Sequence, residues 1–421
     1  MRNFFCLIII LGIMAPALAQ TGTFSRIAFV TLEGQLATVQ SDGSDLVLLT
    51  RGDSELFRFP AWSPDGRNLA AVRDRNNEGA VVVFTFTEDS VEQSVLYTSK
   101  AEPPFYLYWS PNSRIVSFLA NNAQSVLALH LANVGDNFER TLAGGSPLYW
   151  QWAANSSQML VHIGFAGFGA QLGFIDIVND AVIVDLDDPG FFQAPAISHT
   201  EKFVAYAKSS TEIGNKILVR PTNADSLDVQ DFEHKGHVAL GWNPTKDVLA
   251  VMSPREPYAT FAGPIDLIDP NSGSTEQLVD GKAIAFFWSP TGQHLAYLTR
   301  AGGQAGEFAS TANKSFAKIR TDGSRYRVKQ QRPLLLNLWV INIETGNSEL
   351  LATFEPTPTF SRQFLPFFDQ YSRSHRLWSP DGTALTVPAM GENGNSQILV
   401  VNLDGTITRI ATGDMPFWNQ R

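Results

Sequence analysis

Cysteine is almost missing from this chain, since Cys6 is the one cysteine among its 421 residues. A single thiol near the N-terminus excludes an internal disulfide, a thiol nucleophile and a cysteine-based metal site from the main body of the protein. The fold must therefore be held together by its apolar core. A chain of this length with 44% hydrophobic residues has enough apolar side chains to build one.

Long apolar runs are also missing, except at the start of the chain. Arg2, the apolar residues 4–14 and the small residues 17–19 follow the pattern of a secretory signal that is cleaved after Ala19. No later stretch approaches the roughly 20 apolar residues that a membrane-spanning helix needs. We expect a signal peptide over residues 1–19, a secreted or periplasmic mature chain, and no stable membrane span.

Positive charge is in deficit. The chain has 31 Lys and Arg against 41 Asp and Glu, a formal net charge of −10. Long-range repulsion between an acidic protein and phosphate groups opposes general binding to nucleic acid or to an anionic membrane. We therefore expect no nucleic-acid partner.

Motifs that carry chemistry are absent as well. No Gly-x-Ser-x-Gly nucleophile turn occurs, and His234 and His237 are the only close histidine pair. The acidic stretch 185–190 lacks the ligand spacing of a calcium loop. Asp65 and Asp381 resemble a pair of catalytic carboxylates, but each lies in a turn where aspartate is favoured locally. We assign no catalytic residue, no metal and no cofactor.

A repeat is the dominant feature of the sequence. Its clearest copies are Trp-Ser-Pro-Asp-Gly at 62–66 and 378–382 and Trp-Ser-Pro-Thr-Gly at 288–292, each followed by a short apolar run. The aromatic anchors recur every 43–47 residues up to Trp288, if Ile197 takes the place of one tryptophan. The tryptophan anchors are Trp62, Trp109, Trp152, Trp242, Trp288, Trp378 and Trp418.

The repeat unit predicts four short strands. Ser-Pro-Asp-Gly suits a type I turn, and apolar runs on both sides make it a hairpin. A third run, a second turn and a short final strand complete a unit of about 45 residues, which is typical of a propeller blade. We expect an all-β, eight-bladed β-propeller of four-stranded antiparallel blades, a single domain over 20–421.

The two ends of the chain complement each other in this scheme. Residues 26–50 contain three strands without an anchor, and the C-terminal segment supplies one strand that ends at Trp418. A C-terminal strand that joins the N-terminal strands closes the ring and leaves no exposed sheet edge. The anchor tryptophans are interpreted as packing between blades, because large aromatic side chains fill the space between neighbouring sheets.

The repeated aromatic-Ser-Pro-Asp-Gly hairpin resembles the TolB-like, WD40-like propeller repeat. This repeat also occurs in the propeller domains of prolyl-oligopeptidase and dipeptidyl-peptidase type enzymes. The resemblance implies the fold and leaves the activity open, because related peptidases carry their serine in an additional hydrolase domain. No serine motif of that kind is present here.

An insertion at about 301–335 separates Trp288 from Trp378. It is basic, with only two acidic residues between 301 and 332, and we name its cations and its one tyrosine as candidate binding residues: Lys314, Lys318, Arg320, Arg325, Tyr326, Arg327, Lys329 and Arg332. A basic loop on an acidic body can capture an anionic ligand or an acidic protein surface. The alternative is a loop whose charge only keeps it in solvent.

Aromatic residues crowd the segment 360–371. Phe364, Phe367, Phe368 and Tyr371 are candidate binding residues, because aromatic side chains dominate protein-binding hot spots. The same side chains would equally suit a segment that folds over the end of the propeller or the mouth of its channel.

These observations favour an interaction scaffold that binds a protein or peptide and has no catalytic domain of its own. The alternative is binding of a small ligand or carbohydrate, or lyase or hydrolase activity, in the central channel. Residues that line such a channel come from many blades and leave no linear motif.

Overall fold

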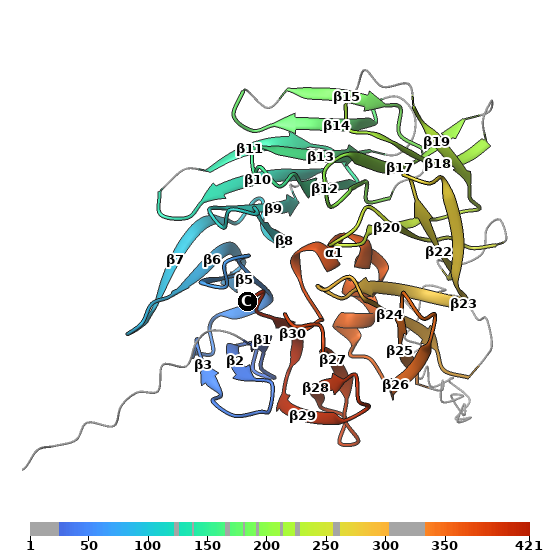
Figure 1. Cartoon of the computed structure of the whole chain (residues 1–421). Coiled ribbons are helices and arrows are strands. Elements are labelled where there is room, and N and C mark those ends of the chain that lie inside the picture. The colour runs from blue at the N-terminus through green and yellow to red at the C-terminus, as the bar shows by residue number, and fades with distance from the viewer. Residues whose placement is uncertain are drawn as a thin grey trace, which may run out of the picture.

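The computed structural model describes residues 25–121, 126–136, 139–164, 169–179, 182–190, 193–210, 214–223, 228–255, 262–302 and 333–421. Antiparallel sheets stand side by side around a central region, and one short helical segment lies inside that region (Figure 1). Within the described residues, no helix has the length and apolar content needed to cross a membrane.

Four-stranded sheets make up the first part of the chain. One sheet has the order β3-β2-β1-β30, and each of the next three is formed by consecutive strands. Their bounds are β1 (Arg26–Val30), β2 (Leu36–Gln40), β3 (Val47–Leu48), β30 (Asp414–Trp418); β4 (Leu56–Trp62), β5 (Asn68–Arg75), β6 (Glu78–Phe86), β7 (Val91–Ser99); β8 (Pro104–Trp109), β9 (Ile115–Asn121), β10 (Leu127–Asn133), β11 (Glu139–Gly144); β12 (Leu148–Trp152), β13 (Gln158–Ile163), β14 (Gln171–Asp176) and β15 (Ile183–Asp187).

The second part holds a four-stranded, a seven-stranded and a three-stranded sheet. Their bounds are β16 (Ala196–Ile197), β17 (Phe203–Ser210), β18 (Gly214–Pro221), β19 (Gln230–Glu233); β20 (Ala239–Trp242), β21 (Leu249–Met252), β22 (Gly263–Asp269), β23 (Ser274–Trp288), β24 (His294–Arg300), β25 (Leu336–Asn342), β26 (Ser348–Phe354); β27 (Ala384–Met390), β28 (Ser396–Asn402) and β29 (Ile407–Thr412). Between β26 and β27 lie the π-helix η1 (Phe360–Phe364), the 3-10 helix η2 (Leu365–Phe367) and α1 (Phe368–Ser374).

The long strand β23 belongs to two neighbouring groups of strands. Its first half, from Ser274 to Val279, pairs with β22, and its second half, from Ala285 to Trp288, pairs with β24. Only Ala283 pairs with both neighbours, and the register shifts on either side of it. The outer strand of one group therefore continues without a break into the inner strand of the next.

The repeat turn has the conformation that its sequence predicts. The amide of Gly66 donates to the carbonyl of Ser63 at 2.8 Å, and Gly66 has a φ of +70°, which favours glycine. Ser63 Oγ donates to Asp65 Oδ1 at 2.6 Å, and Ser379 does the same to Asp381 at 2.6 Å. Both aspartates therefore accept a hydrogen bond that stabilises a tight turn between two strands.

Hydrogen bonds link four of these turns to the next one along the chain, and a fifth links the end of the last strand back to the turn at Gly66. The links are Asp65 N to Ser113 Oγ at 3.0 Å, Asn112 N to Ser156 Oγ at 3.0 Å, Thr200 N to Asp247 Oδ1 at 3.0 Å, Asn243 Nδ2 to the Gly292 carbonyl at 2.8 Å and Asn419 Nδ2 to the Gly66 carbonyl at 3.1 Å. Neighbouring sheets are therefore joined at the same edge by polar contacts as well as by their apolar faces.

The anchor tryptophans lie in the contacts between sheets. Trp62, Trp109, Trp152, Trp378 and Trp418 are buried, whereas Trp242 and Trp288 are half-buried. Four indole Nε1 atoms donate to a carbonyl just before the preceding anchor: Trp109 to Ala61 at 2.8 Å, Trp242 to Ala196 at 3.1 Å, Trp288 to Gly241 at 2.9 Å and Trp378 to Phe287 at 3.0 Å. Ala196 directly precedes Ile197. The repeat in which Ile197 replaces the anchor tryptophan therefore still provides the carbonyl that accepts the indole hydrogen bond.

The last strand completes the first sheet. β30 pairs antiparallel with β1, with Ile27 opposite Trp418 and Ala28 opposite Phe417. Trp418 and Phe417 are both buried. The C-terminal strand therefore occupies the inner position that residues 26–50 leave empty.

The indole bond between sheets can be tested with two buried tryptophans. Trp109→Phe is expected to lower the free energy of unfolding by about 1 to 2 kcal/mol more than Trp62→Phe. The reason is that Trp109 Nε1 donates to Ala61, whereas Trp62 Nε1 has no hydrogen-bond partner among the described residues. Urea unfolding of both variants gives the difference, and equal losses would show that the bond contributes nothing.

Candidate functional site: the plug at the centre of the sheets

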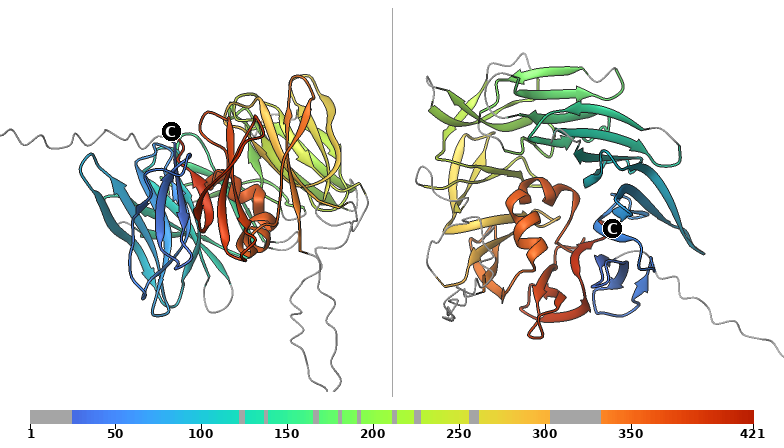
Figure 2. Two further views of the ribbon diagram at one scale, coloured as in Figure 1. Left: turned by 90° about the horizontal axis from the view of Figure 1, so that it is seen from below. Right: turned by 180° about the vertical axis from the view of Figure 1, so that it is seen from behind.

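Residues 360–376, here called the plug, leave the outer strand β26 and lie at the centre of the sheets before the chain resumes at Trp378. Figure 1 shows α1 inside the arrangement of strands, and the view from behind in Figure 2 shows the same. It contacts the inner strands β8, β12 and β20 and the inner half of β23. The plug is therefore surrounded by strands from several sheets.

One side of the plug is aromatic and faces the inner strands. Phe360, Phe364 and Phe368 recur every four residues, and all three are buried. Phe364 lies with its ring centroid 5.4 Å from that of Tyr371, and Tyr371 lies 5.4 Å from Phe59 of β4. Aromatic packing fixes the plug between sheets that are distant in sequence.

This packing decides which of the candidate aromatic residues are accessible. Phe364, Phe368 and Tyr371 are 2%, 6% and 8% exposed, so their side chains are core and are not presented to a partner. Phe367 is 45% exposed. The interpretation of this segment as a docking patch therefore needs correction for three of the four rings.

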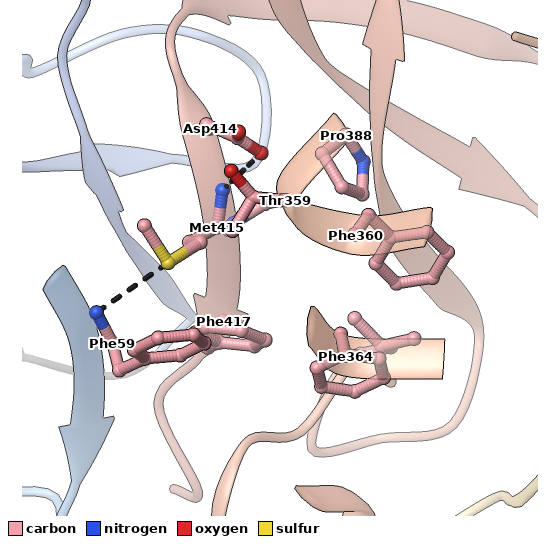
Figure 3. Close-up of a pocket in the computed structure, with 10 residues that line it drawn as sticks. Phe59, Thr359, Phe360, Phe364, Pro388, Asp414, Met415 and Phe417 are labelled. Carbon is pink, nitrogen blue, oxygen red and sulfur yellow. Dashed lines mark hydrogen bonds between the residues drawn. The ribbon is translucent and has the colours of Figure 1, made fainter. Parts of the chain in front are cut away.

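The plug meets the closing strand at a small apolar pocket (Figure 3). Phe360 and Phe364 of η1 face Met415 and Phe417 of β30, and the space between them is about 10 Å³. A cavity of that size holds one water molecule at most. The pocket is a packing joint between plug and closing strand, with no room for a ligand.

The other side of the plug is polar, and its side chains form hydrogen bonds. The side chain of Gln370 accepts from Trp150 N at 3.2 Å, donates to the Trp150 carbonyl at 2.9 Å and donates to Tyr106 Oη at 3.1 Å. Ser374 Oγ lies 2.8 Å from Tyr106 Oη and 2.6 Å from His375 Nδ1. All five residues are buried, so these bonds satisfy groups that water cannot reach.

Asp369 and Arg373 satisfy backbone groups next to the very short inner strand β16. Asp369 Oδ2 accepts from Ala194 N at 3.2 Å, and Arg373 Nη2 donates to the Pro195 carbonyl at 2.7 Å. Burial raises the pKa of Asp369, and the charge of Arg373 opposes that rise. The plug thus replaces the strand pairing that β16, with two residues, does not supply.

Arg376 and Tyr108 lie beyond this network. Both side chains are partly exposed, so solvent reaches them at the centre of the sheets. Burial lowers the pKa of Arg376. Burial raises the pKa of Tyr108, and the charges of Arg373 and Arg376 act against that rise.

A second hollow lies on the outer part of the seven-stranded sheet. Its volume is about 340 Å³, and the rings of Tyr297 and Trp339 stack in it at 6.2 Å with an interplanar angle of 8°. Tyr297 Oη pairs with Ser348 Oγ at 2.8 Å and Trp339 Nε1 donates to Thr299 at 3.1 Å. Because their polar atoms are used within the sheet, the two rings offer the hollow mainly apolar surface.

Metal chemistry finds no support in the described ranges, which contain no group of three or more His, Cys, Asp or Glu side chains placed to hold an ion. The signal segment 1–19 and all the candidate residues of the basic insertion lie outside the described residues: Lys314, Lys318, Arg320, Arg325, Tyr326, Arg327, Lys329 and Arg332.

The structure describes the strand ends that precede the basic insertion and the plug. Arg300 at the end of β24 pairs with Leu336, and Leu336 pairs with Phe354 at the end of β26. Residues 303–332 follow the first of these ends and the plug follows the last. Both insertions therefore depart from the same edge of the sheet, opposite the hairpin turns.

The fold is that of a β-propeller: antiparallel sheets stand around a centre with their inner strands toward it. No protein-family model matches the chain, and no curated protein matches it.

Solved structures are similar to it in fold. One is the dihydro-heme d1 dehydrogenase NirN in complex with DHE, with 13% identity and a TM-score of 0.56 over 95% of this chain and 76% of that chain. Another is the β-propeller domain of the Trilobed protease from Pyrococcus furiosus, with 11% identity and a TM-score of 0.48 over 87% of this chain and 98% of that chain. TolB from Acinetobacter baumannii has 16% identity and a TM-score of 0.38 over 62% of this chain and 66% of that chain. The likeness to NirN, whose TM-score is above 0.5, concerns the fold alone, and the propeller fold that the repeat predicts is confirmed at that level.

Sequence reasoning missed the polar residues of the plug. Gln370 and Arg373 lie in or just after the aromatic segment, but their partners come from β8, β12 and the residues before β16. One signal was available in the sequence. Residues 369–376, which come just before the anchor Trp378, are mostly polar or charged, whereas the residues before the other anchors are mostly apolar.

Substitution of Gln370 tests how much the hydrogen bonds of the plug contribute to stability. Gln370→Leu leaves buried groups of Trp150 and Tyr106 without their partner and is expected to lower the free energy of unfolding by about 2 to 4 kcal/mol. Gln363→Leu is the matched control, because Gln363 is exposed in the same segment and its loss should change stability by about 0.5 kcal/mol or less. Urea unfolding followed by tryptophan fluorescence measures both, and equal effects would contradict the network.

His375 makes stability depend on pH. Burial lowers the pKa of His375 from 6.5 to about 3. Between pH 6.5 and pH 3 this imidazole is therefore protonated in the unfolded chain and neutral in the folded protein. Stability therefore falls as the pH falls from about 6.5 towards 3, by about 1.4 kcal/mol per pH unit for this one group. His375→Asn should remove that share of the slope in urea titrations between about pH 6.5 and pH 4. His199→Asn, at an exposed turn, is the control, and identical slopes in all three proteins would refute the assignment.

Proposed function

We propose that this protein is an exported, eight-bladed β-propeller that serves as a binding scaffold for a protein or peptide. Eight blades follow when the two halves of β23 are assigned to separate blades and each other sheet is counted as one. In this scheme β30 closes a single domain over residues 20–421. The leader-like residues 1–19 support export.

The shared edge of the two insertions carries this proposal. The repeat is regular over most of the chain, and its two large departures, residues 303–332 and the plug, leave the same edge of one sheet. Propellers place variable connections on a rigid ring, and binding residues concentrate on such connections. That edge is the face on which we place the partner.

The charge of the insertion indicates the chemistry of the partner. Residues 301–332 contain seven basic and two acidic residues in a protein of net charge −10. A local positive segment on an acidic body attracts an acidic surface at close range, while the rest of the protein repels it. The proposed partner is therefore an exported protein or peptide with an acidic patch.

Retention of a partner by the mature protein tests the proposal. The immobilised protein is incubated with the exported proteome beside a variant in which a short Gly-Ser linker replaces residues 303–332. We expect a partner that the mature protein retains and the variant loses, and whose binding weakens as salt rises because exposed charges are screened.

A variant of unchanged length, with the seven basic residues replaced by Gln, separates charge from chain length. It should lose the same partner as the deletion. Phe367→Ser tests the exposed ring of the plug on its own. Failure of the mature protein to retain any partner, or equal retention by all variants, would reject this face as the binding surface.

A further inference from the structure

The hollow beside Tyr297 and Trp339, on the outer part of the seven-stranded sheet, has the size of a small-molecule site. Its volume is about 340 Å³. Pockets that hold small ligands measure about 300 to 1,000 Å³. The pocket between the plug and β30 measures about 10 Å³. Of these two spaces, only the hollow has room for a ligand.

The crossing of β23 from one group of strands to the next accounts for the hollow. β23 pairs with β22 as far as Val279, and it pairs with both of its neighbours at Ala283. The residues between them, 280–282, lie opposite no residue of either neighbouring strand. They include Gly281, where an added Cβ would have only Val279 Cγ1 near it, at 3.8 Å. The strand therefore leaves open space at Gly281, which lines the hollow.

Two aromatic rings line the same hollow from β24 and β25. Tyr297 and Trp339 lie opposite each other in the two strands, and their rings are parallel to within 8° with centroids 6.2 Å apart. Tyr297 is buried, whereas Trp339 is half-buried and supplies most of the accessible ring surface. Trp339 Nε1 donates to Thr299 Oγ1 at 3.1 Å, which fixes the indole. This part of the wall is flat and apolar, and the face of such a ring carries partial negative charge.

The rim of the hollow is polar and charged. Asp280 lines the hollow, and its side chain is 78% exposed. Arg255 Nη2 donates to Asp280 Oδ1 at 2.5 Å and to Gln277 Oε1 at 2.9 Å. A carboxylate has about four acceptor positions, so this contact leaves Asp280 able to accept from a ligand as well. The hollow thus combines a flat aromatic surface with a hydrogen-bonding acceptor and a neighbouring donor.

We propose that the hollow binds one sugar ring of a neutral carbohydrate. A pyranose ring has an apolar face of C–H groups, whose partial positive charge suits the face of the Trp339 indole. Its hydroxyl groups both donate and accept, which suits the Asp280 carboxylate and the Arg255 guanidinium at the rim. This site goes beyond the scaffold function and uses no residue of the segment 303–332.

Two other classes of ligand fit the hollow less well. An anionic ligand would meet the carboxylate of Asp280 on a protein with a net charge of −10. A purely apolar ligand would contact the rings, but it would take water from Asp280 without replacing the lost hydrogen bonds. A neutral ring with many hydroxyl groups satisfies both the wall and the rim.

Binding of neutral disaccharides tests the proposal. Maltose, cellobiose, lactose and N,N′-diacetylchitobiose are titrated separately into the mature protein by calorimetry, with sorbitol as an open-chain polyol that has no ring. We expect saturable binding of at least one disaccharide and none of sorbitol. Trp339→Leu should weaken the binding by about tenfold or more, because the ring surface is lost. Asp280→Asn should weaken it by about three- to tenfold, because a charge-assisted hydrogen bond becomes a neutral one.

Asp231→Asn is the matched control for Asp280→Asn. Asp231 is another exposed aspartate with a basic partner, Lys216 at 3.7 Å, and it lies on β19, which does not line the hollow. Its substitution should leave carbohydrate binding unchanged. If Trp339→Leu does not fold, Gly281→Leu takes its place, since Gly281 has no left-handed φ and the new side chain has open space to enter. Gly281→Leu should abolish binding and melt close to the unchanged protein.

Absence of saturable binding of all four disaccharides would overturn the proposal. So would unchanged affinity in Trp339→Leu, or in Gly281→Leu if that variant has to stand in, and so would equal effects of Asp280→Asn and Asp231→Asn. Binding of N-acetyl-leucine amide without binding of any disaccharide would instead identify a pocket for an apolar side chain. These outcomes are independent of the pull-down with the 303–332 variants, so the scaffold proposal and the carbohydrate site can fail separately.

Discussion

The contact between neighbouring sheets is the constraint on which the rest of this structure depends. At four positions an anchor indole donates to the carbonyl just before the preceding anchor, and turn-to-turn hydrogen bonds join the same edges. A repeat of nearly constant length keeps these contacts at one level of the propeller. The inner strands are thereby fixed around a centre that accommodates a helix, whose diameter with side chains is about 10 Å.

The plug packs and forms hydrogen bonds at the centre of the inner strands. Its aromatic side packs on β4 and β30, while its polar side bonds backbone groups that the inner strands leave without partners. The clearest case is β16, whose two residues leave Ala194 and Pro195 to Asp369 and Arg373. A segment that interrupts the repeat in sequence thus completes the hydrogen bonding of the repeat in space.

The two sides of the propeller present different chemistry. The edge where the insertions leave is next to the exposed Phe367 and the ends of β24 and β26, which suits a large partner. The opposite side carries the hairpin turns, which are joined to one another by hydrogen bonds.

The amino-acid sequence by itself determined the repeat, the hairpin turns, the anchors and the joining of the terminal strands. The repeat, the turns and the anchors follow from local rules of turn chemistry and periodicity within one unit of about 45 residues, and the joining of the terminal strands follows from counting strands in the incomplete units at the two ends. Only the tertiary structure decided that Phe364, Phe368 and Tyr371 are core. Burial of these side chains depends on strands more than 300 residues away, such as β4, whose Phe59 packs on Tyr371, and no local pattern encodes such a distance.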